Sequence, residues 1–318
     1  MNIYAIILAA GKGIRMNSTL PKCAHKVIGK PMVEYVVDAI RHQEITEIYT
    51  VVGYQKEVIE EILKNKTKFA FQKEQLGTAN AVKSCEEFLK GKEGVTLIAI
   101  GDMPFITKET YKELLDFHIK SKSDLTVLTT IHKDPSGYGR IVRNSKGQVM
   151  AIVEDKDCVG EQRNIKEINA SVYVIDNKKL FIYLEKIQNV NKQNEYYLTD
   201  LVSLFYEDNL KVSTYIVNDY DEISGINDQN QLVKLEAMLQ KRILDKHIIN
   251  GVDIVDINSV KIGYDVEIGE NVTIMENVEI LGKTVIGNNS SVGPNASVID
   301  SNILEGSKIF DTKIINNK

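Results

Sequence analysis

Residues 8–22 read Leu-Ala-Ala-Gly-Lys-Gly-Ile-Arg-Met-Asn-Ser-Thr-Leu-Pro-Lys and directly follow a short apolar run. That run, Ile3–Leu8, is rich in β-branched residues and shows no polar alternation, which is typical of a strand buried on both faces. Gly11 and Gly13 then open a loop in which the backbone can approach a ligand closely. A glycine loop at the carboxyl end of a buried parallel strand predicts a nucleotide site in an open α/β sheet.

The glycine spacing narrows the kind of nucleotide site. Gly-x-Gly-x-x-Met is not the dinucleotide fingerprint, and it lacks the Gly-Lys-Ser/Thr ending of a P-loop. Arg15 and Lys22 bring two cations to this loop, although a plain strand-to-helix turn with solvated charges is the alternative. The full string through Pro21-Lys22 resembles the signature of sugar-1-phosphate nucleotidyltransferases, in which the glycine loop holds a nucleoside triphosphate.

The composition is that of an ordinary globular protein. The chain has 318 residues, 43% hydrophobic and 26% charged, which is enough for two domains. A net charge of −5 without a basic block argues against a nucleic-acid partner. No stretch is long and apolar enough to span a bilayer, so we expect no membrane partner and a cytoplasmic location. Three distant cysteines argue against disulfides, and Cys23 is interpreted as a loop-packing residue.

Up to about residue 227 the chain alternates short apolar runs with helical patterns, which is typical of a parallel α/β sheet. Besides Ile3–Leu8, the predicted strands are Ile48–Val52, Val95–Ile100 and Leu125–Thr130, and the predicted helices are Met32–His42, Thr78–Leu89, Lys108–Ile119 and Thr199–Phe205. Three short runs without helices between them predict a small antiparallel sheet covering the main one: Gly139–Val142, Val149–Glu154 and Ile168–Ile175. Gln229–Ile249 predicts one long helix.

After Gly251 the periodicity changes to six. Aliphatic or aromatic residues recur at Ile262, Ile268, Ile274, Ile280, Ile286, Val292, Val298, Leu304 and Phe310. Hexapeptide repeats predict a parallel β-helix of about three coils, in which each repeat turns one side chain inward. The last histidine, His247, precedes the repeats, so a general base for acyl transfer is missing there and we expect a module for assembly. The expected domains are therefore 1–227, a linking helix 228–250 and repeats 251–318.

Other polar residues stand where a phosphoryl-transfer site needs them. Asp102 follows the strand Val95–Ile100 and should face the same crevice as the glycine loop; its carboxylate suits a metal ion. Gln72 and the string Gln75-Leu-Gly-Thr78 can read the edge of a pyrimidine, or can simply begin a helix. Asn227 can bind a metal or cap the following helix.

Taken together, the motifs resemble the N-acetylglucosamine-1-phosphate uridylyltransferases, the nucleotidyl half of bacterial bifunctional enzymes that make UDP-N-acetylglucosamine. The motifs stand in family order: Leu8–Lys22, Gln72–Thr78, Gly101-Asp102-Met-Pro104, Gly137-Tyr-Gly-Arg140, Ile152-Val-Glu154, Glu167-Ile-Asn169, Glu195-Tyr-Tyr-Leu-Thr-Asp200 and Gly225-Ile-Asn227. The resemblance implies a Rossmann-like α/β domain with a mixed, mostly parallel sheet, followed by a short left-handed β-helix. It also implies a Mg²⁺-dependent reaction of UTP with N-acetylglucosamine 1-phosphate, in a homotrimer.

The resemblance assigns roles to individual residues. It implies that the catalytic cations are Arg15 and Lys22. The implied nucleotide-binding residues are Leu8, Ala10, Gly11, Gln72, Gly77 and Thr78. The implied contacts to the sugar phosphate are Gly139, Glu154, Asn169 and Thr199, and the implied Mg²⁺ ligands are Asp102 and Asn227.

Three departures from the family pattern affect these expectations. The family commonly has Asn-Thr-Gly where this chain has Asn169-Ala170-Ser171, and His where Asn80 stands. The repeats stop at Lys318, so we expect no acetyltransferase activity. The alternatives are the same chemistry on another sugar phosphate or nucleotide, such as glucose 1-phosphate or dTTP, and a catalytically silent subunit that binds nucleotide-sugars.

Overall fold

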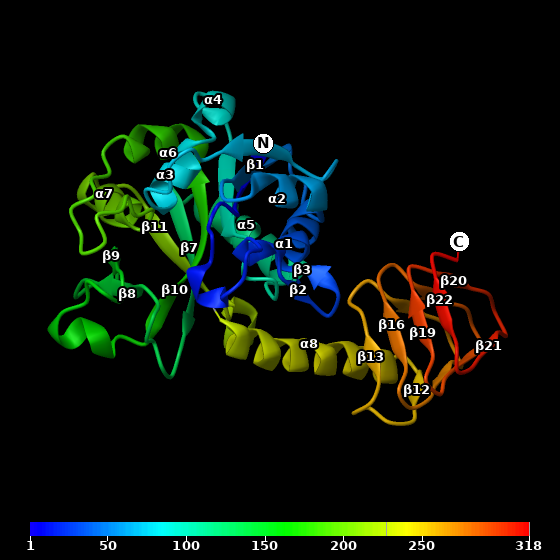
Figure 1. Ribbon diagram of the computed structural model, residues 1–318. Helices are drawn as coiled ribbons and strands as arrows, with labels where there is room; N and C mark the ends of the chain where they lie inside the picture. Colours follow the sequence, from blue (N-terminus) through cyan, green and yellow to red (C-terminus); the bar gives the residue numbers. More distant parts are fainter. Residues whose placement is uncertain (227, 318) are drawn as a thin grey trace. The chain divides into compact units, whose positions relative to one another are not determined.

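The computed structural model describes residues 1–226 and 228–317 (Figure 1). The chain divides into two compact units. The first consists of Met1–His25 and Met32–Asn227, and the second of Lys26–Pro31 and Asp228–Lys318. The short segment Lys26–Pro31 therefore groups with the second unit, although it lies early in the sequence.

The first unit is built on a nine-stranded mixed sheet. Seven strands follow the order β11-β7-β10-β6-β1-β4-β5, and β8 and β9 extend it from β10. The strands are β1 (Ile3–Leu8), β4 (Glu47–Val52), β5 (Lys68–Phe71), β6 (Val95–Ile100), β7 (Leu125–Ile131), β8 (Arg140–Arg143), β9 (Val149–Val153), β10 (Glu167–Asp176) and β11 (Val212–Ile216). β10 and the β8–β9 hairpin run antiparallel to their neighbours, and the other pairs are parallel.

Helices cover both faces of this sheet (Figure 1). Helices α1 (Met32–Arg41), α2 (Lys56–Ile62) and α5 (Lys108–Ser121) pack on one face, whereas the other carries α3 (Thr78–Lys83), α4 (Glu86–Leu89), α6 (Asn177–Leu184) and α7 (Asp200–Glu207). Strand β1 shows why both faces are apolar. Tyr4 and Ile6 enter one core cluster and Ala5 and Ile7 the other, because side chains alternate along a strand.

Two predictions for this unit need correction. The three short runs do not form a separate sheet over the main one, because β10 is inserted between β6 and β7 and carries β8 and β9 at its end. Residues 172–175 are apolar and buried on both faces, which suits a central strand better than a cover. The predicted helix Thr78–Leu89 is interrupted between α3 and α4, at Ser84 and Cys85.

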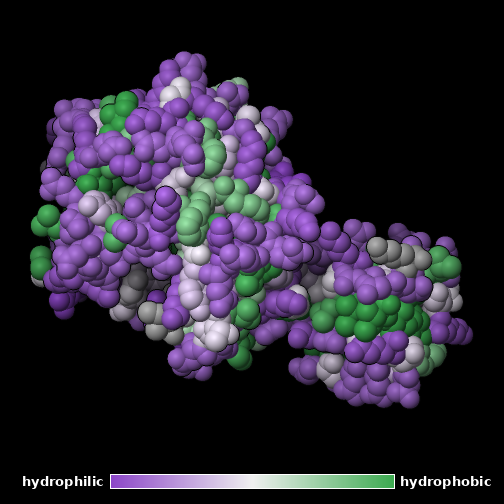
Figure 2. All heavy atoms as spheres, turned by 45° about the horizontal axis from the view of Figure 1, so that its top comes forward, coloured by the Kyte–Doolittle hydropathy of each residue, from purple (hydrophilic) through white to green (hydrophobic). Residues whose placement is uncertain are grey.

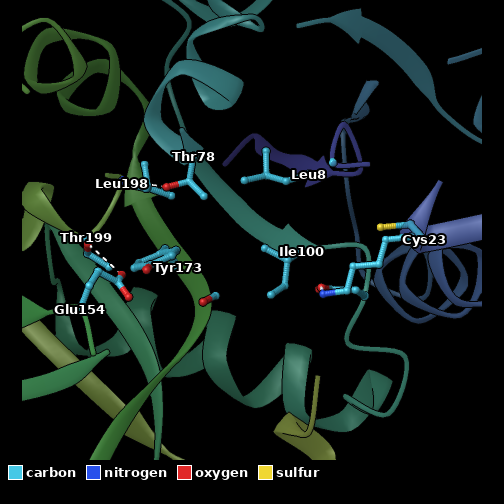
Figure 3. A pocket seen from close by; sticks show the side chains of 12 residues that line it. Leu8, Cys23, Thr78, Ile100, Glu154, Tyr173, Leu198 and Thr199 are labelled. Atoms are coloured by element: carbon cyan, nitrogen blue, oxygen red, sulfur yellow. Dashed lines mark hydrogen bonds and ion pairs between the residues drawn. The ribbon is translucent and has the colours of Figure 1, made fainter. Parts of the chain in front are cut away.

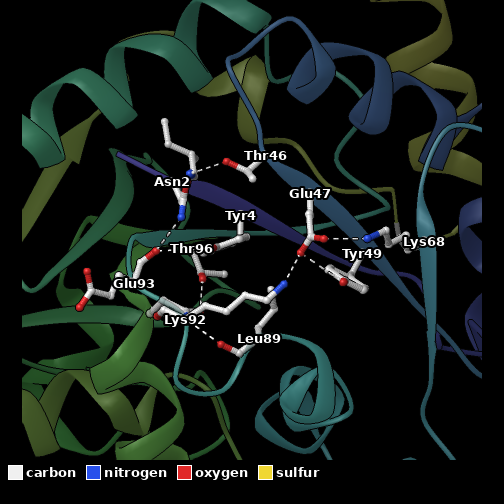
Figure 4. A network of polar contacts seen from close by, with 12 residues as sticks. Asn2, Tyr4, Thr46, Glu47, Tyr49, Lys68, Leu89, Lys92, Glu93 and Thr96 are labelled. Carbon is white, nitrogen blue, oxygen red and sulfur yellow. Dashed lines mark hydrogen bonds and ion pairs between the residues drawn. The ribbon is translucent and has the colours of Figure 1, made fainter.

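A charged network joins the amino ends of the parallel strands (Figure 4). The Glu47 carboxylate accepts hydrogen bonds from Lys68 Nζ at 2.7 Å and Lys92 Nζ at 2.6 Å. These bonds lower the pKa of Glu47 to about 2. Asn177 adds two hydrogen bonds to the carbonyls of Leu89 and Lys92, at 2.7 and 2.9 Å. The network ties β4, β5 and the segment before β6 together at the end opposite the glycine loop.

The second unit contains the predicted long helix, α8 (Gln229–Ile249), which is confirmed. Asp228 caps it by accepting a hydrogen bond from the Gln231 amide at 2.9 Å. Within the described residues, no helix combines the length and the apolar character needed to cross a bilayer.

The repeats form the expected left-handed parallel β-helix, with three sheets wound around an aliphatic core. Its strands are β12 (Asp253–Ile254), β13 (Lys261–Ile262), β14 (Glu267–Ile268), β15 (Thr273–Ile274), β16 (Glu279–Leu281), β17 (Val285–Ile286), β18 (Ser291–Val292), β19 (Ser297–Ile299), β20 (Asn302–Ile303), β21 (Lys308–Ile309) and β22 (Lys313–Ile315). Asparagines at the corners adopt positive φ, as Asn271 at 54° and Asn289 at 58° do, and these two side chains are hydrogen-bonded at 3.2 Å.

The prediction that Leu304 and Phe310 point inward is wrong. Leu304 is 74% exposed and Phe310 is 44% exposed, whereas Ile303 and Ile309 are buried. The pairing explains the shift, because Ile286 pairs with Ile303 and not with residue 304. The corner between β19 and β20 is one residue shorter than a regular six-residue repeat would make it. The inward positions that follow therefore fall one residue earlier, at Ile303 and Ile309.

Candidate active site

A cavity of about 330 Å³ opens at the carboxyl ends of β1 and β6 (Figure 3). It is lined by Leu8, Gly11, Lys22, Cys23, Thr78, Ile100, Asp102, Glu154, Ser171, Tyr173, Leu198 and Thr199. Seven of these twelve residues are site residues that the sequence analysis named. The carboxyl edge of a parallel sheet is where open α/β folds bind their ligands.

Lys22 and Asp102 form an ion pair in this cavity. Asp102 follows the end of β6, and Lys22 begins the short helix η2 (Lys22–Ala24) after Pro21. Both side chains are 16% exposed, so the pair is largely withdrawn from water. The second oxygen of Asp102, Oδ1, is buried and has no hydrogen-bond partner among the described residues. Burial, together with the charge of Asp102, raises the pKa of the neighbouring Cys23 thiol, which suits a packing residue.

The glycine loop leaves open space beside this pair. A Cβ added to Gly11 would meet no atom within 4 Å, so protein packing does not account for the glycine and the space is available to a ligand. Gly13 has φ +69°, and its added Cβ would lie 2.5 Å from Lys22 Cβ, so this glycine lets Lys22 approach. Ala10 is buried, and its carbonyl accepts hydrogen bonds from the Tyr54 amide and from Gln75 Nε2 at 3.1 and 2.7 Å.

The segment from Gln72 to Thr78 is fixed from two sides. Gln72 is buried, and its Nε2 donates hydrogen bonds to the Gly77 carbonyl at 3.3 Å and to Asn80 Oδ1 at 2.8 Å. Gly77 has φ +117°, and its added Cβ would lie 2.5 Å from the Tyr196 carbonyl oxygen. Thr78 Oγ1 accepts a hydrogen bond from the Leu198 amide at 2.9 Å. Because both side-chain amide hydrogens of Gln72 are already donated to protein oxygens, its Oε1 oxygen is the group that it can offer to a ligand.

The four residues predicted to bind the sugar phosphate lie together. Glu154 Oε1 accepts a hydrogen bond from Thr199 Oγ1 at 3.2 Å (Figure 3), and the Asn169 amide donates to the Gly139 carbonyl at 2.8 Å. An added Cβ on Gly139 would lie 2.8 Å from Ile152 Cγ2 and 3.6 Å from Glu154 Oε1. This packing therefore leaves no room at position 139 for a side chain larger than the hydrogen atom of glycine. Of these four residues, Glu154 and Thr199 line the cavity.

Negative charge accumulates around this group. Burial raises the pKa of Glu154, and Asp157, Asp200 and Asp155 add to the shift. Burial also raises the pKa of Asp200 to about 6, with a further contribution from Asp157. A hydroxyl-rich ligand that donates hydrogen bonds to Glu154 suits such a surface.

Two predicted site residues need separate mention. Arg15 lies on the short helix η1 (Ile14–Met16), where its side chain is exposed, and it does not line the cavity. Asn227 lies outside the described residues. Its neighbour Ile226 donates its amide hydrogen to the Asp102 carbonyl at 3.3 Å.

Five lining residues escaped the sequence analysis as site residues: Cys23, Ile100, Ser171, Tyr173 and Leu198. Cys23 and Leu198 directly neighbour the predicted site residues Lys22 and Thr199, and this adjacency was a usable signal. Ser171 has φ +54°, which is unusual for a residue other than glycine. It sits where the pairing of β10 with β7 shifts register, between Asn169 and Tyr173. Its amide donates to Asn169 Oδ1 at 2.9 Å.

The donor set fits a hard divalent cation. Asp102 offers a buried carboxylate oxygen without a donor, and carboxylate oxygen is the ligand that Mg²⁺ prefers. The described residues contain no group of three or more His, Cys, Asp or Glu side chains arranged for a metal. Mg²⁺ is commonly held by one or two carboxylates together with substrate phosphates, so an all-protein cage is not required.

Comparison with known proteins identifies the class. Residues 4–225 match the family model described as nucleotidyl transferase, and residues 265–300 match the model described as bacterial transferase hexapeptide (six repeats). Because the first match covers more than half of the chain, this chain belongs to the nucleotidyl transferase family. The nucleotidyltransferase class expected from the glycine loop is thereby confirmed.

Individual relatives refine this result. The bifunctional protein GlmU of Streptococcus suis is 46% identical over 265 residues, which cover 83% of this chain and 58% of that protein. GlmU of Streptococcus thermophilus is 47% identical over 266 residues, covering 84% of this chain and 58% of that protein. The chain thus spans less than two thirds of the length of these curated relatives.

A solved structure supports the fold. The crystal structure of a Bacillus anthracis protein described as a glucose-1-phosphate thymidylyltransferase superimposes with a TM-score of 0.59. The match covers 74% of this chain and 94% of that one at 19% identity. At this identity the likeness concerns the fold alone.

Proposed function

We propose that this chain transfers the uridylyl group of UTP to N-acetylglucosamine 1-phosphate, giving UDP-N-acetylglucosamine and pyrophosphate. The observation that carries the proposal is the cavity itself, which brings the glycine loop and the Lys22–Asp102 pair together with Glu154 and Thr199. The Lys22 cation and open backbone at one side suit a triphosphate, and a carboxylate with hydroxyls at the other suits a sugar.

The reaction is an in-line displacement at phosphorus. A phosphate oxygen of the sugar phosphate attacks the α-phosphorus of UTP, and the bond to the bridging oxygen of the β-phosphate breaks to release pyrophosphate. Two anions must approach, so charge neutralisation and alignment are the main requirements. Lys22 and Arg15 supply the positive charge in this proposal, and Gly11 gives the nucleotide access to the backbone.

Recognition of the two substrates is divided between the two sides of the cavity. On the nucleotide side, Leu8, Ala10, Gly77 and Thr78 surround the base and ribose, and Gln72 Oε1 accepts a hydrogen bond from uracil N3–H. On the sugar side, the residues that hold N-acetylglucosamine 1-phosphate are Gly139, Glu154, Asn169 and Thr199. Glu154 and Thr199 are already hydrogen-bonded to each other, so this side is organised before a sugar binds.

We propose Mg²⁺ as the cofactor, held by Asp102 and Asn227 together with phosphate oxygens. When bound, the ion neutralises phosphate charge and orients the triphosphate for displacement. The structural feature that supports this assignment is Asp102 Oδ1, which is buried and accepts no hydrogen bond from the described residues.

We propose a cytoplasmic homotrimer assembled through the β-helix. Figure 2 shows hydrophobic side chains gathered on one face of the hexapeptide region. Across the repeats as a whole, Val255, Tyr264 and Val285 are among the exposed apolar residues. Such a surface favours association. The repeats contain no histidine, so in this proposal they serve assembly and not acetyl transfer.

We also propose that the catalytic domain spans 1–227, the linking helix 228–250 and the repeat domain 251–318.

Pyrophosphate release measured with Mg²⁺, UTP and N-acetylglucosamine 1-phosphate tests the proposal, with glucose 1-phosphate and dTTP exchanged in turn. The expected result is fast release with the first pair alone. Faster release with another pair would keep the mechanism and change the substrate. No release with any pair, from folded protein that still binds UTP, would favour a silent nucleotide-sugar-binding subunit.

A further inference from the structure

Residues 26–31 form a small hairpin with an unusual turn. Strands β2 (Lys26–Val27) and β3 (Lys30–Pro31) are antiparallel and are joined by Ile28 and Gly29. Both turn residues have positive φ, 47° for Ile28 and 83° for Gly29. A β-branched residue in this left-handed region is a real outlier that costs about 1–2 kcal/mol. Ile28 is nevertheless buried, at 2% exposed.

The strained turn is held by residues that are distant in sequence. The Ile28 amide donates a hydrogen bond to Glu236 Oε1 on α8 at 3.0 Å. Lys30, which is 7% exposed, pairs with Asp265 of the β-helix at 2.9 Å, and its Nζ lies 5.2 Å from the centre of the Tyr264 ring. A turn kept in a costly conformation by several outside contacts is over-determined, and such strain concentrates at functional sites.

The hairpin is also joined directly to the segment that carries Lys22. The His25 carbonyl accepts the Met32 amide hydrogen at 3.0 Å, which closes the base of the hairpin. The His25 amide in turn donates to the Lys22 carbonyl at 3.3 Å. Helix η2, which begins at Lys22, therefore ends where the hairpin begins. Only three residues, Cys23 to His25, separate Lys22 from the first residue of the hairpin.

We propose that the hairpin 26–31 is a positioning element for Lys22, set by Lys30–Asp265 and Ile28–Glu236. The inference rests on the proposed function, because Lys22 is there the cation beside the reacting phosphates. The helix α8 and the β-helix then contribute to the rate of uridylyl transfer as well as to assembly. Lys30, Asp265 and Glu236 are positioning residues, since they act through Lys22 and touch no reacting atom.

Steady-state kinetics of the full chain tests this inference. Asp265→Asn and Lys30→Met should lower kcat about tenfold, because a displacement well under 1 Å of a charge-stabilising group costs that much. KM for both substrates should stay within about twofold, since neither variant alters a substrate contact. Lys30→Arg keeps the cation and should retain the wild-type kcat. Hydrogen exchange at the Cys23–His25 amides should accelerate in the two slow variants.

Asp38→Asn is the matched control. It removes a carboxylate from another part-buried lysine, Lys66, to which Asp38 is bonded at 2.7 Å and which keeps Glu34 at 2.8 Å. Its kcat should equal that of the wild type. Light scattering must show the same mass for all variants, so that a change in assembly is not mistaken for positioning. If Lys30→Met does not fold, Glu236→Ala tests the same connection with the ion pair intact.

The outcomes separate the two proposals. A wild-type chain without transferase activity would end the proposed function, and the positioning role with it. An active wild type with unchanged kcat in Asp265→Asn and Glu236→Ala would overturn the positioning role alone. Equal losses in the Asp38→Asn control would also overturn it, because the effect would then be general destabilisation.

Discussion

The pair Lys22–Asp102 allows stability and catalysis to be separated by a double-mutant cycle. Lys22→Met removes the cation and leaves the Asp102 carboxylate, only 16% exposed, without its partner. Breaking a buried pair from one side costs about 3–5 kcal/mol of folding free energy. Because both side chains keep some contact with water, we expect the lower end, about 3 kcal/mol.

Lys22→Met also removes the positive charge that, in the proposed mechanism, lies beside the reacting phosphates. Loss of one preorganised group of this kind lowers kcat by about 100- to 1000-fold, equivalent to roughly 3–4 kcal/mol. The double variant Lys22→Met with Asp102→Asn leaves no uncompensated charge. Its free energy of unfolding should return to within about 1 kcal/mol of the wild type, but its kcat should not recover.

Urea unfolding and pyrophosphate release are the two assays, applied to the wild type, both single variants and the double variant. We expect the double variant to regain its stability while its activity stays lost, as required if Lys22 acts on the reacting phosphates. It would be refuted if Lys22→Met kept more than about a tenth of the wild-type kcat. Recovery of activity in the double variant would refute it equally, because the ion pair would then be purely structural.

Three further predictions follow from individual side chains. Ser171→Gly removes left-handed strain of about 1–2 kcal/mol, but it also raises the conformational entropy of the unfolded chain, which costs about 0.4–1 kcal/mol. Urea unfolding should therefore show a free energy of unfolding about 0.5–1 kcal/mol higher than that of the wild type. A lower value would mean that Ser171 is unstrained. The pKa of Glu47 is lowered from 4.5 to about 2 by Lys68 and Lys92, so its contribution to folding stability is present above pH 4.5 and is lost as the pH falls towards 2. Glu47→Gln should lower the free energy of unfolding by about 1 kcal/mol at pH 7, after allowing for the exposed lysines. A destabilisation that persists at pH 2 would contradict this electrostatic origin. Chelation should stop turnover and Mg²⁺ should restore it, and Asp102→Asn should raise the half-maximal Mg²⁺ concentration at least about tenfold; an unchanged midpoint would place the ion elsewhere.

Local patterns predicted much of the fold. The strand Ile3–Leu8 and the helix Gln229–Ile249 have the same limits in the structure, because buried runs and helical periodicity are properties of adjacent residues. Asp102 was placed beside the glycine loop correctly for a general reason. It follows β6, which pairs with β1 in parallel, so their carboxyl ends meet at one edge.

Features that depend on distant pairing were not predictable in the same way. No local signal shows that β10 enters the main sheet between β6 and β7, since strand order is decided by contacts far apart in the chain. A single missing residue in a corner was enough to turn Leu304 outward. The left-handed Ser171 was noticed as a departure from a motif, but its φ of +54° depends on the irregular pairing of β10.

The hairpin 26–31 also has a consequence for biosynthesis. Lys30 and Asp265 are 235 residues apart, so at about 5–20 residues per second the ribosome needs roughly 10–50 s to supply the partner. Until Glu236 and Asp265 have both been made, the hairpin lacks at least one of the two contacts that hold its strained turn. We therefore expect the segment around Lys22 to be the last part of the nucleotidyl unit to mature, and nascent chains to be most sensitive to proteases there.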